Sequence, residues 1–299
     1  GAHVRAECFA QLLPYDERER KDERYLFVFN PSPWKRSEVI ETEIEFFLQD
    51  VVVGLNPEVK IDERRPQVKG FKLFGPDNRE VPYQLVNRQE AFGVTYSKRD
   101  YPHQTLVDRF SILVSAHDIP SMGWKGLTVS KAESMPLYPS EVDTGNRFIE
   151  NEYLRIEANN RGQVILTDKL TGLVYEDINS FEDSGDVGDE YTYSYPDRDV
   201  WYTSNQFVPQ ISIEEKGPLR ASLKLEHRMA VSKEASNDAK SRSTEMAELQ
   251  IVTTFSLTRF SRRVDIKTVM HNACKDHRLR ALFSTGIDTV ESYAETPFA

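Results

Sequence analysis

The chain has 299 residues, which is enough for two domains of ordinary size. Its 38 lysine and arginine residues against 48 aspartate and glutamate residues give a net charge of −10, a poor match for a phosphate backbone, so we expect no nucleic-acid partner. No stretch approaches the run of about 20 apolar residues that a bilayer-crossing helix needs, and we expect no membrane partner. The 11% aromatic content argues against disorder. The two cysteines, Cys8 and Cys274, are too few for a disulfide framework and favour a cytoplasmic protein.

Residues 1–24 are predicted to be the remnant of a helix followed by a linker. Apolar side chains recur there at helical spacing, at Val4, Cys8, Phe9, Leu12 and Leu13. The charged run over 16–23 follows them and is typical of a solvated connection. The chain starts with neither an initiator methionine nor a secretory signal, so we expect it to have been cut from a longer protein.

Residues 25–135 are predicted to form a small, immunoglobulin-like β-sandwich. Between 40 and 46, residues alternate between two faces: Ile40, Thr42, Ile44 and Phe46 on one, and Glu41, Glu43 and Glu45 on the other. This alternation predicts a sheet with one buried face and one solvated face. Two short strands around a turn at 75–78, and a second alternating stretch over 110–116, extend the same pattern.

Residues 145–299 are predicted to form a second, larger antiparallel sandwich. The stretch 149–177 has the pattern of a meander, with turns at 159–162 and 168–172. Longer alternating strands are predicted over 219–229, 249–257 and 264–270. The polar stretch 231–248 between the first two of these is predicted to be a long mobile loop. The predicted fold class is therefore all-β, with two antiparallel sandwiches in succession.

The segment 180–202 is the richest in groups that could carry chemistry. It brings carboxylates and aromatic rings together, among them Glu182, Asp183, Asp186, Asp189, Glu190, Tyr191, Tyr193, Tyr195, Trp201 and Tyr202. Carboxylates accept hydrogen bonds from sugar hydroxyls, aromatic faces stack on the apolar side of a pyranose, and a suitably spaced carboxylate pair hydrolyses glycosides. A solvated acidic loop and a calcium site fit the same residue types, although the acids lack the spacing of a calcium-binding loop. The residue types alone leave these interpretations open.

A zinc site is a weaker hypothesis for 271–280. His271, Cys274 and His277 recur at three-residue intervals, but a fourth ligand is not evident and this spacing does not fall on one side of a strand. We therefore favour a hydrogen-bonded histidine at a strand end and expect no metal site in the chain. His227 lies on the apolar face of its strand and is predicted to be a hydrogen-bonded core histidine. No nucleophile motif is present, and we assign no catalytic residue.

Three blocks of the sequence resemble the C-terminal half of the glycoside hydrolase family 38 α-mannosidases. They are FNPSPWKRSEVIE, IENEYLRIEANNRGQVILTDKLTGLVYEDINSFEDSGDVGDEYTYSYP and RVDIKTVMHNACKDHRLRALFSTGI. The most similar type is bacterial, of the group that includes mannosylglycerate hydrolases. The resemblance runs from about Tyr25 to the end of the chain. It implies an N-terminal α/β catalytic domain and a helical bundle upstream, and a mutarotase-like supersandwich as the larger of the two sandwiches here, truncated at its C-terminus.

The resemblance also implies which chemistry lies elsewhere. Family members bind zinc through two histidines and two aspartates, one of which is the nucleophile of a retaining mechanism, and no counterpart motif is found in 1–299. We therefore expect no cofactor in this chain and zinc in the parent enzyme. An active-site arginine that the family contributes late in the chain is expected beyond Ala299.

One active-site contribution of the sandwich is expected within the chain. A family tyrosine reaches the bound sugar from this region, and its local pattern matches GDEYTY, so Tyr191 is the implied sugar contact. Asp189 and Tyr193 are secondary candidates. For Asp183 and Asp186 we expect a structural role in turning the loop through its glycines.

The resulting functional hypothesis concerns the parent protein. It hydrolyses terminal α-mannosides, and this chain, by itself non-catalytic, supports the catalytic domain and lends a tyrosine to the site. The expected partners are that N-terminal catalytic domain and the mannoside. Two alternatives from other classes are an independent carbohydrate-binding module and an oligomerisation scaffold that forms a homodimer.

Overall fold

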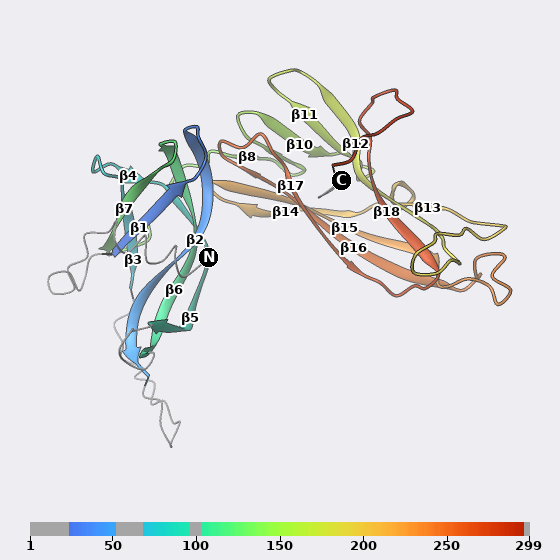
Figure 1. The fold of residues 1–299 in the computed structure, drawn as a ribbon, viewed down its shortest axis with the longest axis horizontal. Helices are drawn as coiled ribbons and strands as arrows, with labels where there is room; N and C mark the ends of the chain where they lie inside the picture. Colours follow the sequence, from blue (N-terminus) through green and yellow to red (C-terminus); the bar gives the residue numbers. More distant parts are fainter. Residues whose placement is uncertain (1–23, 52–67, 96–102, 296–299) are drawn as a thin grey trace. The chain divides into compact units, whose positions relative to one another are not determined.

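A computed structural model describes residues 24–51, 68–95 and 103–295. The predicted helix remnant over 1–13 and the charged linker over 16–23 lie outside the described residues. The chain divides into two compact units between Tyr138 and Pro139. Within the described ranges there is no α-helix, and every pair of neighbouring strands is antiparallel, which confirms the predicted all-β class (Figure 1). No helix there is long and apolar enough to cross a membrane.

The first unit contains two sheets. One has the order β1-β7-β3-β4, with the bounds β1 (Arg24–Asn30), β7 (Gly123–Ala132), β3 (Gly70–Phe74) and β4 (Glu80–Val81). The other has the order β2-β6-β5, with the bounds β2 (Arg36–Asp50), β6 (His103–Ile119) and β5 (Tyr83–Thr95). β3 and β4 flank the turn predicted at 75–78, where Asn78 donates its backbone N–H to the carbonyl of Gly75.

Aromatic packing dominates the core between these two sheets. The ring of Phe71 stacks on Tyr83, with centroids 4.7 Å apart, and meets Phe110 edge-on at 5.2 Å. Ile44 and Phe46 are buried in the same cluster, as the alternation of β2 predicted. The glutamates that alternate with them pair outward: the guanidinium of Arg109 on β6 lies 2.6 Å from Glu45.

The second unit also contains two sheets. The seven-stranded sheet has the order β13-β12-β11-β10-β9-β8, and β18 pairs with β12 as well. Its bounds are β8 (Asp143–Thr144), β9 (Phe148–Glu150), β10 (Leu154–Ala158), β11 (Val164–Asp168), β12 (Val174–Gly185), β13 (Tyr202–Thr203) and β18 (His277–Phe283). The four-stranded sheet has the order β14-β15-β16-β17, with the bounds β14 (Gln210–Lys216), β15 (Arg220–Ser232), β16 (Met246–Thr258) and β17 (Asp265–His271). A single 3₁₀ turn, η1 (Ser204–Gln206), follows β13.

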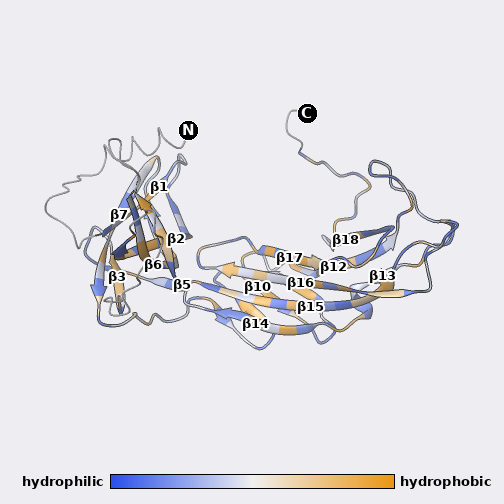
Figure 2. Cartoon of the chain, turned by 90° about the horizontal axis from the view of Figure 1, so that it is seen from below, coloured by the Kyte–Doolittle hydropathy of each residue, from blue (hydrophilic) through white to orange (hydrophobic). Residues whose placement is uncertain are grey.

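The meander predicted over 149–177 is formed by β9 to β12. Its two turns close where predicted, with Gly162 and Gly172 at φ values of 83° and 74°. This left-handed conformation favours glycine, because a side chain there would be strained. Hydrophobic and hydrophilic residues alternate along β15 and β16, as predicted. In Figure 2 they appear as orange and blue residues that follow one another along these strands.

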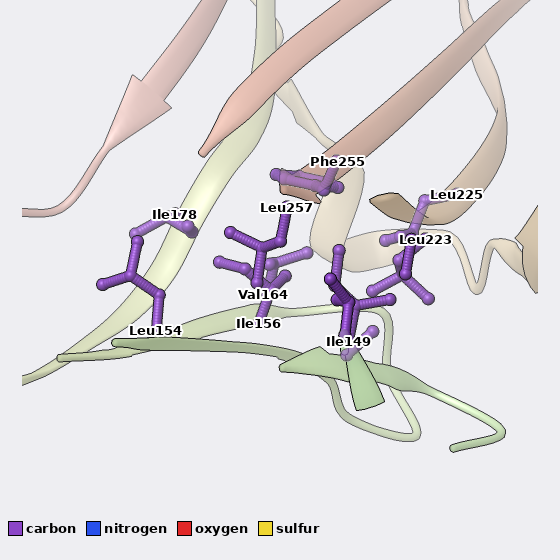
Figure 3. Packing of buried hydrophobic residues seen from close by; sticks show 12 residues of the cluster. Ile149, Leu154, Ile156, Val164, Ile178, Leu223, Leu225, Phe255 and Leu257 are labelled. Carbon is purple, nitrogen blue, oxygen red and sulfur yellow. The ribbon is translucent and has the colours of Figure 1, made fainter. Parts of the chain in front are cut away.

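Two apolar clusters lie along the β15–β16 hairpin. The larger one joins the meander to the hairpin: Ile149, Leu154, Ile156, Val164 and Ile178 face Leu223, Leu225, Phe255 and Leu257 (Figure 3). The smaller cluster lies nearer the connection that joins the two strands, and contains Phe181, Met229, Val231, Leu249, Ile251 and Cys274.

The connection between β15 and β16 differs from the prediction. Because β15 extends to Ser232 and β16 begins at Met246, it comprises only 233–245. Backbone hydrogen bonds cross it, from Ser236 to Ser241 at 2.8 Å and from Ser243 to Glu234 at 2.9 Å. The predicted mobile loop is thus a hydrogen-bonded connection, and it ends near a buried arginine described below.

Candidate functional site

The acidic–aromatic loop, defined as residues 186–201, connects β12 to β13. Asp186 closes it near its base, because its Oδ1 accepts the backbone N–H groups of Gly188 at 3.0 Å and Ser194 at 3.2 Å. Val187 donates its N–H to the carbonyl of Ser194 at 2.7 Å. A Cβ on Gly188 would lie 1.8 Å from the carbonyl oxygen of Thr192, so this close approach requires glycine. Asp186 therefore turns the loop, which is the structural role predicted for it.

Asp189 shapes the tip of the loop. Its Oδ1 accepts the backbone N–H groups of Tyr191 at 2.9 Å and Thr192 at 2.7 Å. These hydrogen bonds, the one from Tyr191 first, lower the pKa of the Asp189 carboxyl, because they stabilise its charged form. The carboxylate thus fixes the backbone that presents Tyr191.

The tyrosines of the loop differ in how they are held. Tyr191 has a side chain that is 93% exposed, and among the described residues its phenol makes no hydrogen bond and its ring no ring contact. Tyr193 is less exposed, because its ring lies 6.4 Å from that of Tyr195 and the guanidinium of Arg278 on β18 stacks over it at 4.5 Å. Among the tyrosines of the loop, Tyr191 is thus the most exposed, and it is the one without a ring contact among the described residues.

Asp183 does not turn the loop as predicted, because it lies within β12 and is completely buried. Its Oδ2 is 2.5 Å from Nδ1 of His277, and its Oδ1 is 2.6 Å from Nη2 of Arg242. Arg242 lies in the β15–β16 connection, and His277 is the first residue of β18. The burial of all three side chains explains the difference: a buried carboxylate requires cationic partners.

Arg242 also contacts the end of the acidic–aromatic loop that leads into β13. Nη1 of Arg242 donates to the carbonyl of Val200 at 3.0 Å, and its guanidinium lies over the ring of Tyr202 at 5.1 Å. At the near end, the N–H of Gly185 donates to Asp199 at 3.0 Å. In Figure 1 the connection between β12 and β13 and the connection between β15 and β16 lie at the same end of the unit. Nothing in the composition of 231–248 indicated that Arg242 would be buried.

The hypothetical zinc ligands are not gathered into a site. Within the described ranges, no group of three or more histidine, cysteine, aspartate or glutamate side chains could hold a metal ion. His277 is occupied by Asp183 and by Asn272, whose Oδ1 is 3.1 Å from its Nε2. Cys274 is buried, and burial raises the pKa of its thiol. These residues do not fit zinc, and the hydrogen-bonded histidine favoured at this strand end is what the structure shows.

His227 is buried on the apolar face of β15, as predicted, but it is not fully hydrogen-bonded. Its Nδ1 has no partner within the described residues, and neither have Oδ1 of Asp177 and Oδ1 of Asn179. The three residues line a cavity of about 10 Å³, room for a single water molecule. Burial lowers the pKa of His227 to about 4, so the ring is neutral near pH 7.

The fold and the loop define a class of protein: a two-unit antiparallel β-sandwich chain with an exposed tyrosine on an acidic loop. Residues 149–299 match the family described as "Glycosyl hydrolases family 38 C-terminal domain". This match spans half of the chain, so the chain belongs to glycoside hydrolase family 38, as its sequence blocks predicted.

Individual relatives agree with this assignment. A curated protein from Halalkalibacterium halodurans, described as "Putative mannosylglycerate hydrolase", is 23% identical over 243 residues, which are 76% of this chain and 27% of that protein. An α-mannosidase from Enterococcus faecalis V583 has a similar structure, with a TM-score of 0.81 and 21% identity over 96% of this chain and 34% of its own. A second structure from Enterococcus faecalis, of a protein in glycosyl hydrolase family 38, has the same TM-score and identity. The match there spans 96% of this chain and 36% of that protein. The chain thus spans about a third or less of each relative, and the structural likeness shows a shared fold.

Proposed function

We propose that this chain is the C-terminal part of a longer family 38 α-mannosidase. The parent hydrolyses terminal α-mannosides with retention, using a zinc ion held by a catalytic domain upstream of the chain. Support comes from the family match over 149–299 and from the small share of each relative that the chain spans. The chain supports the catalytic domain and contacts the sugar through Tyr191.

The geometry of Tyr191 is the observation that carries this proposal. A phenol hydroxyl both donates and accepts hydrogen bonds, and its ring stacks on apolar sugar faces. Asp189 holds the backbone of Tyr191, while the side chain of Tyr191 has no partner among the described residues. Tyr193 is secondary, because Arg278 already covers one face of its ring.

No bond-breaking step is assigned to this chain. Asp183 is buried in an ion pair, Asp186 and Asp189 accept backbone hydrogen bonds, and Glu182 pairs with Arg280. These four acids of the segment are thus used by the chain's own structure. What remains to its residues is to bind and orient the sugar.

Replacing Tyr191 in the longer protein tests the proposal. Tyr191→Phe removes one hydrogen bond to the sugar, and we expect kcat/KM for an aryl α-mannoside to fall about threefold to tenfold. Tyr195→Phe is the matched control, since Tyr195 is also exposed on the same loop, and it is expected to leave kcat/KM unchanged. Equal values for wild type and Tyr191→Phe would refute the sugar contact.

A second candidate function is an independent carbohydrate-binding module. It is favoured by the exposed rings that one segment presents, namely Tyr191, Tyr193, Tyr195 and Trp201. Calorimetric titration of the chain with mannose or mannobiose distinguishes the two: binding tighter than millimolar supports a stand-alone module. The homodimer alternative predicts a dimer in light scattering of the chain, and a monomer at high concentration would exclude it.

A further inference from the structure

We propose that one internal water molecule is bound between β12 and β15. It donates hydrogen bonds to Oδ1 of Asp177 and Oδ1 of Asn179, and it accepts one from the Nδ1–H of His227. These three residues define the hydration site. The water joins the two sheets of the second unit, because β12 belongs to the seven-stranded sheet and β15 to the four-stranded sheet. The inference does not depend on the proposed function.

Unpartnered buried atoms mark the hydration site. His227 and Asn179 are 5% and 7% exposed. Nδ1 of His227, Oδ1 of Asp177 and Oδ1 of Asn179 are buried atoms without a hydrogen-bond partner in the part of the chain that the structure describes. A buried polar atom that makes no hydrogen bond is destabilising, and such atoms are rare in folded proteins. All three residues line one cavity, so one bound molecule can satisfy them together.

The backbone of β12 is irregular at the two residues that it contributes to the site. Asp177 and Asn179 have φ values of 54° and 58°, a left-handed conformation that is uncommon for residues other than glycine. The pairing of β12 with β11 and with β18 also shifts register in this stretch. Such bulges redirect side chains, and backbone strain of this kind persists where the structure uses it. Here Asp177, Ile178 and Asn179 all line the same cavity, although they follow one another in a strand.

The size of the cavity and the number of its ligands favour water over a cation. The volume of about 10 Å³ is the room that a single water molecule needs. A calcium ion takes about six to eight oxygen ligands, whereas two unpartnered oxygens are present here. The other carboxylate oxygen of Asp177 already accepts a hydrogen bond from Asn205 at 3.1 Å. Buried waters make about three hydrogen bonds to groups that otherwise lack a partner, which is the number that this site offers.

The count of hydrogens determines the role of His227. A water molecule donates two hydrogen bonds, and the oxygens of Asp177 and Asn179 accept both of them. A third acceptor would stay unsatisfied, so Nδ1 of His227 carries the hydrogen and donates to the water. Burial lowers the pKa of His227 to about 4, and the ring is therefore neutral near pH 7. The hydrogen on Nδ1 is then the single N–H of this ring.

The hydration site also connects to the 3₁₀ turn η1. Asn205 of η1 donates to Asp177, and Oγ of Ser204 accepts the backbone N–H of Phe181 on β12 at 3.0 Å. The water thus extends a hydrogen-bonded network from η1 through the bulge of β12 to His227 on β15. Loss of the water is expected to loosen β12 at the bulge, because the amides there belong to the residues that hold it.

A crystal structure of the chain tests the site in wild type. We expect one water within about 3.2 Å of Nδ1 of His227 and of the two oxygens. A dry cavity, or a cation at about 2.4 Å from the oxygens, would overturn the inference. Nitrogen NMR at about pH 7 tests the role of His227: Nδ1 is expected to be protonated and Nε2 unprotonated. A ring protonated on Nε2 alone would contradict the assigned hydrogen bond.

A matched pair of variants measures what the water contributes. Asparagine and leucine have nearly the same shape, but asparagine can donate a hydrogen bond from near the position of Nδ1. Exchange protection of the 177–180 amides is expected to be about tenfold lower in His227→Leu than in His227→Asn, the effect of one lost hydrogen bond in a buried site. Without a bound water the order would be reversed, because an unpartnered amide is unfavourable in an apolar core.

Equal protection in the two variants, or higher protection in His227→Leu, would therefore refute the hydration site. If neither variant folds, the crystal structure and the NMR of wild type decide.

Discussion

The two ends of the β15–β16 hairpin differ in how they are held. Around Leu223 and Phe255 it packs against the meander through apolar side chains. Near its connecting segment, the hairpin packs the smaller apolar cluster and also contributes Arg242 to a buried group of charged side chains that includes Asp183. Apolar packing is not directional and tolerates adjustment, whereas a buried ion pair depends on each partner. One end is thus suited to stability, and the other to holding a loop in one arrangement.

Removing the apolar contact is expected to have the largest effect. Phe255→Ala deletes a fully buried ring from the larger cluster and is expected to lower the free energy of unfolding of this unit by about 3–5 kcal/mol. Hydrogen exchange of the β15 and β16 amides measures this. A loss below about 1 kcal/mol would show that the cluster does not hold this end together.

Breaking the charged group is expected to cost somewhat less. Asp183→Asn leaves the charge of Arg242 buried without a carboxylate, and we expect the free energy of unfolding to fall by about 3 kcal/mol. Arg228→Gln is the control on the same hairpin, since Arg228 pairs with Glu248 in solvent. This exposed pair is expected to contribute less than about 1 kcal/mol. Equal effects of the two variants in urea unfolding would contradict the contrast between the buried and the exposed pair.

The smallest of the three effects concerns His227, which lies between the two clusters on β15. Its pKa of about 4 lies below the ordinary value near 6.5. Between these two pH values the ring is protonated in the unfolded chain and neutral in the folded chain. Stability is therefore lost as the pH falls from about 6.5 to about 4, and we expect the free energy of unfolding to fall by about 2.5 kcal/mol over this range. His227→Gln should remove this part of the acid sensitivity. The difference between the two pH profiles isolates His227, and parallel profiles would contradict its burial as a neutral ring.

The contrast between the two ends also explains what the sequence could predict. Alternation along 219–229 and 249–257 specified which side chains are buried, because a strand exposes every second residue to the same face. The turns at Gly162 and Gly172 could be predicted from the local sequence, because their backbone conformation favours glycine. These features depend on neighbours in the chain, and the structure confirms them.

The buried group of Asp183, Arg242 and His277 depends instead on contacts between distant segments. Asp183 stands among other acids in the sequence, and Arg242 lies in a polar stretch without any periodic pattern. The pairing of β12 with β18 brings His277 to the carboxylate of Asp183, and the course of the β15–β16 connection brings Arg242 there. The exposed tip was more accessible to prediction, because the Asp189 turn that presents Tyr191 is local.

The proposed role of this chain is to contribute contacts to a mannosidase without breaking a bond itself. The most direct test is an assay of the purified chain with an aryl α-mannoside, with and without added zinc. We predict no turnover in either condition. Metal-dependent turnover that is lost on Asp189→Ala would contradict the claim and would place the reaction within the acidic–aromatic loop.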